Sequence, residues 1–127
     1  MSKSLFILML SILGFIGCNA QRGSSIDSKE AYGLIKADSN IAILDVRTAK
    51  EFADGHVAGA VNIDVNQTDF AQKIDELDRS KTYIVYCRLG IRSRKAVGIM
   101  AAKGFKNLYN VSDGFVGWNK NGLPFEK

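Results

Sequence analysis

The fold of this chain is decided by residues 82–93, which read TYIVYCRLGIRS. The first five residues are apolar, β-branched or aromatic and predict a buried strand, and the residues that follow the loop resemble a helix. Cys87 therefore stands where a strand ends and a helix begins. The free N–H groups of a helix start bind anions and lower the pKa of a thiol, and Arg88 and Arg92 add positive charge. The segment predicts a thiolate nucleophile in an anion-binding loop.

The spacing within this loop separates two classes of cysteine enzyme. Four residues lie between Cys87 and Arg92, whereas cysteine phosphatases need five between their cysteine and arginine to wrap a tetrahedral phosphate. Position 93, where that arginine would stand, is serine. The loop instead resembles the active-site loop of rhodanese-like sulfurtransferases, in which a cysteine and five further residues surround a sulfur atom carried as a persulfide. The resemblance implies that Cys87 is catalytic. The residues that would then bind the substrate are Arg88, Leu89, Gly90, Ile91, Arg92 and Ser93.

Motifs on both sides of the loop carry the same resemblance. The first half of the family pattern, DVR-x3-EF-x2-GH-[IV]-x-GA-x-N-[IV], is matched between residues 45 and 63, and its ending is matched at 114–118 and 122–124. The resemblance implies an α/β fold with a central parallel five-stranded sheet and helices on both faces. One histidine and one free cysteine are too few for an ordinary metal site, so we expect neither a metal nor an organic cofactor.

Local patterns predict the remaining helices and strands. Asp27 and Thr48 are each followed three residues later by a glutamate, a pattern that marks a helix start. Strands that alternate with helices indicate a parallel sheet covered on both faces. We expect helices at 28–37, 48–54, 67–78 and 93–103, and strands at 41–45, 61–64, 82–86 and 107–110.

The N-terminal segment predicts export and a lipid anchor. Lys3 and the apolar stretch 5–17 resemble a signal peptide, and at roughly 1.5 Å per helical residue this stretch is too short for the ~30 Å core of a bilayer. Its end resembles a bacterial lipobox, so we expect Cys18 to carry lipid. The alternative is a cleaved secretory peptide that leaves Cys18 as an ordinary thiol. The expected order is a signal peptide at 1–17, a lipidated cysteine and tether at 18–25, and a rhodanese-like domain at 26–127 that is anchored in the bacterial cell envelope and faces the periplasm.

Two residues outside the loop are further candidates for the site. Arg47 follows the predicted strand 41–45, whose carboxyl end opens on the same sheet edge as Cys87. It is a candidate to bind the substrate, although in the family the corresponding Asp and Arg also form structural ion pairs. His56, the only histidine, is a candidate general base, but the glycines around it favour a structural role in a tight turn.

Positive charge is concentrated around the cysteine. The chain has a formal net charge of +4, and residues 79–112 contain eight Lys or Arg and no Asp or Glu. This segment would attract a small anion and stabilise a thiolate. Nucleic acid is not favoured as a partner, because the cations alternate with predicted core strands instead of lying along one helix.

These features together predict a sulfurtransferase. Cys87 as a thiolate takes the outer sulfur of a small anionic donor such as thiosulfate, and a thiol or cyanide then accepts it. One alternative is a persulfide relay or binding module that serves a partner protein without turnover of small donors. A small cysteine phosphatase or an arsenate reductase is disfavoured by the loop length. For Cys87 alone, the remaining alternative is an ordinary buried core cysteine.

Overall fold

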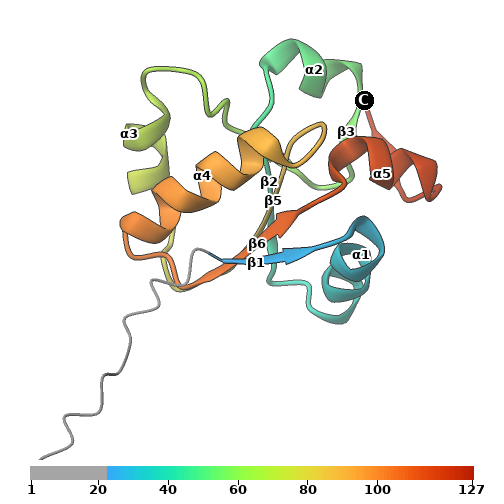
Figure 1. Ribbon diagram of the computed structural model, residues 1–127, viewed down its shortest axis with the longest axis horizontal. Coiled ribbons are helices and arrows are strands. Elements are labelled where there is room, and N and C mark those ends of the chain that lie inside the picture. The colour runs from blue at the N-terminus through green and yellow to red at the C-terminus, as the bar shows by residue number, and fades with distance from the viewer. Residues whose placement is uncertain (1–22) are drawn as a thin grey trace, which may run out of the picture.

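Residues 23–127 are described by the computed structural model, and they fold around one parallel sheet (Figure 1). The predicted signal peptide and Cys18 lie outside the described residues. Within residues 23–127, no helix is both long enough and apolar enough to span a membrane. The sheet has five strands in the order β1-β6-β5-β2-β4, and every pairing is parallel. The predicted five-stranded parallel sheet is therefore confirmed.

Three longer strands form the centre of the sheet and two short ones form its edges. The strands are β1 (Ser24–Ile26), β2 (Ala42–Asp45), β4 (Val61–Asn62), β5 (Thr82–Tyr86) and β6 (Asn107–Val111). Strand β5 is buried on both faces, as its continuous apolar run predicts. The four predicted strands agree with the observed bounds to within two residues at each end.

Strand β1 differs from the prediction, which assigned Ser24 and Ser25 to a tether. Both residues pair in parallel register with β6, opposite Tyr109 and Asn110. The tether prediction is wrong at these two positions. An edge strand with two exposed serines has no apolar periodicity, so its backbone pairing leaves no pattern in the sequence.

Helices cover both faces of the sheet, as predicted. They are α1 (Ser28–Ala37), α2 (Ala49–Asp54), α3 (Phe70–Asp75), α4 (Ile91–Ala102) and α5 (Gly114–Lys120). Side chains of α3 and α4, among them Ile74 and Met100, pack into the core on one face. Helices α1 and α5 lie side by side on the other face (Figure 1), where Ala31 and Trp118 are buried.

Local side chains fix the starts of two helices. Asp27 accepts a hydrogen bond from the Glu30 N–H at 2.8 Å, which confirms the predicted start of α1. Thr48 and Glu51 form a complete capping box at the start of α2, because each side chain accepts from the other residue's backbone N–H. The second predicted start is confirmed as well.

Two predicted helices have different bounds in the structure. Helix α4 begins two residues before the predicted 93–103, because Gly90 at φ +87° turns the chain directly into it. Helix α3 covers only the middle of the predicted 67–78, where Phe70 and Ile74 are buried. The apolar spacing identified the buried face of α3 but not its ends.

Besides β1, three short elements have no counterpart in the sequence prediction. Helix α5 contains two buried glycines, which lower its helix propensity, so the sequence gives no clear signal for a helix there. Strands β3 (His56–Val57) and β7 (Phe125–Glu126) form a separate antiparallel pair. Two-residue strands are too short to show a period.

The carboxylate of Asp45, at the end of β2, is fully buried and links neighbouring strands. It accepts hydrogen bonds from the backbone and guanidinium of Arg47, with Nη2 at 2.7 Å, and from the Tyr86 hydroxyl at 2.6 Å. The same hydroxyl accepts from the Val57 N–H at 3.0 Å, and Arg47 donates to the Gly55 carbonyl at 2.7 Å. Burial, together with the Asp45 charge, raises the pKa of Tyr86, so the phenol stays a donor. The network fixes the ends of β2 and β5 to the start of β3.

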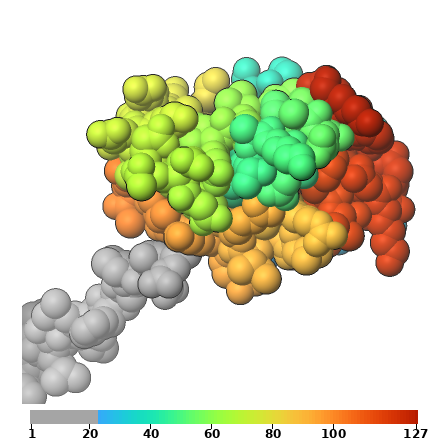
Figure 2. Space-filling model, turned by 90° about the horizontal axis from the view of Figure 1, so that it is seen from above, coloured from blue at the N-terminus to red at the C-terminus, as the bar shows by residue number. Residues whose placement is uncertain are grey.

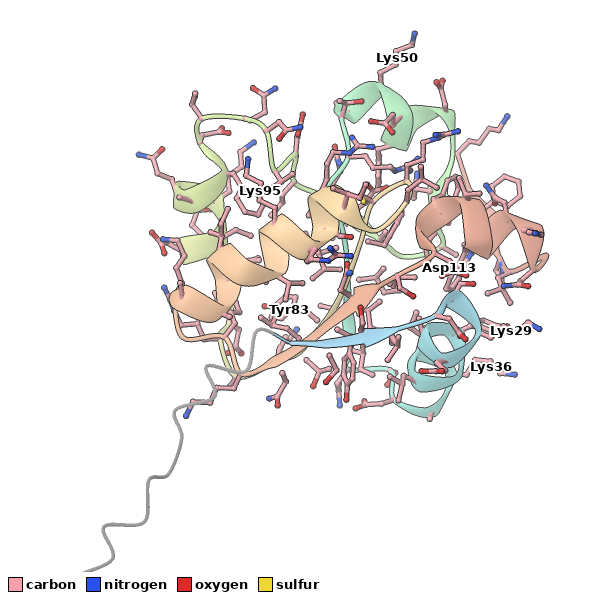
Figure 3. The ribbon with its side chains drawn as sticks, in the orientation of Figure 1. Lys29, Lys36, Lys50, Tyr83, Lys95 and Asp113 are labelled. Atoms are coloured by element: carbon pink, nitrogen blue, oxygen red, sulfur yellow. The ribbon has the colours of Figure 1, made fainter. Side chains whose placement is uncertain are left out.

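We expect removal of this carboxylate to be strongly destabilising, because it leaves a buried guanidinium unpaired. Asp45→Ala should lower the free energy of unfolding by about 3–5 kcal/mol, and Tyr86→Phe by about 1–3 kcal/mol. Urea unfolding followed by Trp118 fluorescence measures both. Tyr83, labelled in Figure 3, is the control: its hydroxyl donates only to the Asp78 carbonyl at 2.7 Å, so Tyr83→Phe should lower stability by about 0.5–1.5 kcal/mol. A loss for Tyr86→Phe no larger than that of the control would contradict the role of the network.

Candidate active site

Cys87 lies at the carboxyl end of β5, as predicted, and its side chain is buried, with 2% exposed. The sulfur receives a hydrogen bond from the Gly90 N–H at 3.1 Å and lies 3.3 Å from the Ser93 hydroxyl. Burial by itself would raise the pKa of the thiol. Hydrogen bonds from the Ser93 side chain and from the backbone of Ser93, Leu89 and Gly90 outweigh it and lower the pKa below its usual value. The loop's own dipoles therefore stabilise a thiolate.

Helix α5 fixes the loop through hydrogen bonds between the two backbones. The Cys87 carbonyl accepts a hydrogen bond from the Phe115 N–H at 2.8 Å, and the Arg88 carbonyl accepts one from the Val116 N–H at 3.2 Å. With these carbonyls directed at α5, the N–H groups of the loop are left to face the sulfur. The surfaces of α2, the loop and the start of α5 adjoin one another when the molecule is seen from above (Figure 2).

Two glycines permit this close packing. At Gly90, whose φ is +87°, a Cβ would lie 2.5 Å from the Ser112 carbonyl oxygen. At Gly114, whose φ is +57°, a Cβ would overlap the Arg88 carbonyl. The amide of Asn110 also donates to the Gly90 carbonyl, at 3.3 Å. The loop can therefore adopt this curvature only with glycine at both positions, because any larger side chain would clash there.

Arg92 was expected to attract the substrate, and the structure places a carboxylate against it. Its terminal nitrogens donate to the two carboxylate oxygens of Glu51 at 2.7 and 2.9 Å. Hydrogen bonding to Arg92 is the main cause that lowers the pKa of Glu51, to about 2, so the carboxylate is charged at neutral pH. The pair joins the start of α4 to α2 beside the nucleophile. A direct contact between Arg92 and the substrate stays a prediction.

The rest of the predicted loop forms an exposed rim. Leu89 and Ile91 present apolar side chains that are 52% and 71% exposed. Arg88 is exposed and borders a surface hollow that Glu51 and Phe115 also line. The structure therefore gathers all of the predicted loop residues around or beside Cys87, and their contacts with a substrate stay predictions.

Arg47 lines the same hollow, but its observed contacts are structural. Its guanidinium pairs with Asp45, donates to the Gly55 carbonyl and lies over the Phe115 ring, 4.4 Å from the ring centroid. These contacts support the structural alternative that the sequence left open. Binding of the substrate by Arg47 stays a prediction.

His56 has a structural setting in strand β3. Its Nδ1 lies 2.8 Å from the Phe52 carbonyl oxygen, and its Nε2 lies 3.3 Å from the Glu126 carboxylate. The ring stacks on Phe52 with 3.6 Å between centroids. Nothing in these contacts directs the imidazole at Cys87, so they favour the structural role that the sequence indicated. Within residues 23–127, no group of three or more His, Cys, Asp or Glu side chains could hold a metal ion.

Sequence reasoning missed three residues that shape the site. Glu51 was recognised as a helix-capping residue and as part of a motif but not as a residue of the site, although it follows a strand that ends at the same sheet edge as Cys87. Asn110 gives a usable signal, because a buried amide in a central strand needs a nearby polar partner. Gly114 was recognised only as part of a motif, and its close contact with the loop cannot be deduced from one sequence.

Comparisons with known proteins agree with this fold. The rhodanese-like domain model matches residues 27–121. The chain is 35% identical over 103 residues to thiosulfate sulfurtransferase GlpE of Actinobacillus succinogenes, a match that covers 81% of this chain and 90% of that protein. A rhodanese-related protein from Thermoplasma volcanium has a TM-score of 0.72 at 32% identity, with 81% of this chain and 97% of that one covered. A rhodanese-like domain protein from Staphylococcus aureus has a TM-score of 0.70 at 27% identity, with 82% and 99% covered. The chain belongs to the family of rhodanese-like domains.

Proposed function

We propose that this protein is a thiosulfate-type sulfurtransferase that carries sulfur on Cys87. The observation that carries the proposal is that two polar groups of the loop contact the sulfur. The Gly90 N–H donates to it at 3.1 Å, and the Ser93 hydroxyl lies 3.3 Å from it. Family membership and the 35% identity to a thiosulfate sulfurtransferase support the same function. The sulfurtransferase predicted from the sequence is thus the function that the site fits best.

The first half-reaction transfers sulfur to the enzyme. The Cys87 thiolate attacks the outer sulfur of thiosulfate, a bond forms between the two sulfur atoms, and the sulfur–sulfur bond of the donor breaks. Sulfite leaves with the electron pair. The loop N–H groups that stabilise the thiolate also lie where they can stabilise the anionic terminal sulfur of the new persulfide.

The second half-reaction transfers sulfur to an acceptor. A thiolate or cyanide attacks the terminal sulfur, and Cys87 leaves as a thiolate. Because a thiol with a lowered pKa is a better leaving group, the hydrogen bonds of the loop favour this step too. The two half-reactions share one site, so the kinetics should be ping-pong.

A persulfide relay to a partner protein is the second candidate function. Leu89 and Ile91 expose apolar side chains within four residues of the nucleophile. A small anion does not need apolar contacts at this rim, whereas a protein that presents its own cysteine does. Kinetics with a protein thiol as acceptor would distinguish a relay from an enzyme that turns over small acceptors.

We also propose that lipid on Cys18 anchors the domain in the bacterial cell envelope, facing the periplasm. The short apolar leader and the lipobox-like end support this proposal. Strand β1 runs in the same direction as β6 and β5 (Figure 1). Gly23 directly precedes β1 and Cys87 directly follows β5, so the two residues lie at opposite ends of the sheet. Five residues from Cys18 to Gly23 would extend at most about 17 Å. The proposed anchor would therefore hold the domain close to the bilayer, by the sheet end opposite to the active site.

We expect thiosulfate to leave one extra sulfur atom on Cys87, because the loop stabilises a persulfide. Intact mass spectrometry should show the added sulfur, and cyanide should remove it as thiocyanate. Cys87→Ser should show neither event. Hydrolysis of an aryl phosphate through Cys87, with no sulfur taken from any sulfane donor, would mean that the protein is a phosphatase instead.

We expect Ser93→Ala to raise the pKa of Cys87, because it removes the side-chain hydrogen bond that does most to lower it. Sulfur loading from thiosulfate at neutral pH should fall by about 10- to 100-fold, the equivalent of one hydrogen bond to a charged group. The pH profile of iodoacetamide alkylation measures the pKa directly, and its midpoint should move up. Ser80→Ala is the control, since the Ser80 hydroxyl bonds to Asp78 on the surface. An unshifted midpoint in Ser93→Ala would contradict the assigned hydrogen bond.

We expect Cys18→Ser to abolish lipid incorporation and to leave unprocessed precursor, because the modified thiol is gone. Labelling of cells with a tagged palmitate measures incorporation. Cys87→Ser serves as the control and should be labelled like the wild type. Undiminished labelling of Cys18→Ser would refute the lipid anchor and leave the proposed activity untouched.

A further inference from the structure

The loop contributes two arginines to the site, but only one of them is unpaired. Arg92 is held in a two-point ion pair by Glu51. Arg88, in contrast, has no ion-pair partner among residues 23–127 and is exposed. The positive charge that the sequence places beside Cys87 is therefore about half neutralised.

Glu51 is held rigidly in this position. One of its carboxylate oxygens accepts from the Thr48 N–H at 3.3 Å and from the Thr48 hydroxyl at 3.2 Å, while both oxygens face Arg92. Lys50, the residue before Glu51 on α2, points away from the loop into solvent (Figure 3), so it does not offset the Glu51 charge. Asp64 is a second acidic group close enough to act on Arg92, but it forms no ion pair with it.

Repulsion between Glu51 and a bound donor depends on the charge of that donor. Each negative charge on the donor interacts with the carboxylate, so a dianion is repelled about twice as strongly as a monoanion at the same place. Both the carboxylate and Arg88 line the hollow beside the loop. Of the residues that the structure describes, two cations line the hollow, Arg88 and Arg47, and Arg47 is paired with Asp45. Two carboxylates line it as well, Glu51 and Asp54.

We propose that Glu51 is a specificity-determining residue, which neutralises Arg92 and thereby shifts the relative preference of the site from doubly charged sulfane donors, such as thiosulfate, towards singly charged ones. This inference rests on the proposed sulfurtransferase function. Glu51 acts through Arg92 and through its own field, and it does not contact the reacting sulfur. If the role of Glu51 were purely structural, its substitution would change the stability of the protein but not the dependence of the rate on donor charge.

Glu51→Gln tests the proposal, because glutamine keeps an oxygen that can accept from Thr48 and Arg92 but carries no charge. The donors are thiosulfate, a dianion, and benzenethiosulfonate, a monoanion that delivers the same sulfane sulfur. The measurement is kcat/KM of sulfur loading for each donor. We expect the ratio of thiosulfate to benzenethiosulfonate to rise by about 3- to 30-fold, the range expected for one charge at a partly exposed site.

Two variants serve as controls. Thr48→Ala removes the hydroxyl that caps α2 and contacts Glu51, but it keeps the Thr48 backbone N–H, the Glu51 charge and the ion pair with Arg92. Glu30→Gln removes one negative charge from the exposed first turn of α1. Both should keep the wild-type ratio. An unchanged or lower ratio in Glu51→Gln would overturn the proposal, and a lower one would mean that Glu51 instead orients Arg92 towards the dianion.

A second measurement does not depend on sulfur transfer. Iodoacetate and iodoacetamide alkylate the same thiolate, and only the first is an anion. We expect Glu51→Gln to raise the ratio of the iodoacetate rate to the iodoacetamide rate at Cys87 by a similar factor. An unchanged ratio would again overturn the proposal. If the wild type accepts sulfur from neither donor, the proposed function fails, whereas the alkylation ratio still decides whether Glu51 controls the charge of the site.

Discussion

The buried carboxylate of Asp45 is the interaction on which the rest of the structure depends. It lies at the end of β2, and it neutralises Arg47 and binds the hydroxyl of Tyr86 within a fully buried space. Removal of either charged partner would leave the other unpaired in a medium of low dielectric constant, so the two must be present together. Tyr86 is the last residue of β5, and Cys87 follows it directly. The position of the nucleophile is therefore set by a charge pair on the neighbouring strand.

The loop adds a second requirement. Its carbonyl groups need hydrogen-bond donors from outside the loop. Helix α5 supplies them, because its first N–H groups bind the carbonyls of Cys87 and Arg88. The N–H groups in the first turn of a helix have no hydrogen-bond partner within the helix. In α5 the carbonyls of the loop are these partners. The same arrangement leaves the N–H groups of the loop to face the sulfur. The same hydrogen bonds therefore stabilise the start of α5 and fix the conformation of the loop around Cys87.

Much of this could be predicted from the sequence, and the failures have physical causes. The strand 82–86, the caps at Asp27 and Thr48 and the parallel sheet depend on local patterns, which a sequence displays directly. The family motifs located Cys87 and its loop. Strand β1 and helix α5 were missed, because pairing at a sheet edge and packing of glycines against a loop depend on residues far away in the chain. The partner of Arg92 was missed for the same reason: Glu51 lies 41 positions away and already had a local explanation as a cap.

In the described part of the chain, two of the three arginines near Cys87 are each paired with a carboxylate, and this pairing affects how the site stabilises negative charge. Arg47 is matched by Asp45 and Arg92 by Glu51, so the thiolate is stabilised chiefly by backbone and hydroxyl dipoles. Those dipoles lie within a few ångströms of the Cys87 sulfur and stabilise the thiolate at that point. An unpaired guanidinium acts over a longer range, and it would attract the sulfite product as well as the donor. A site built on dipoles therefore stabilises the reacting sulfur without retaining the anion that has to leave. Arg88 is the exception, because it is exposed at the rim of the loop and has no ion-pair partner among residues 23–127.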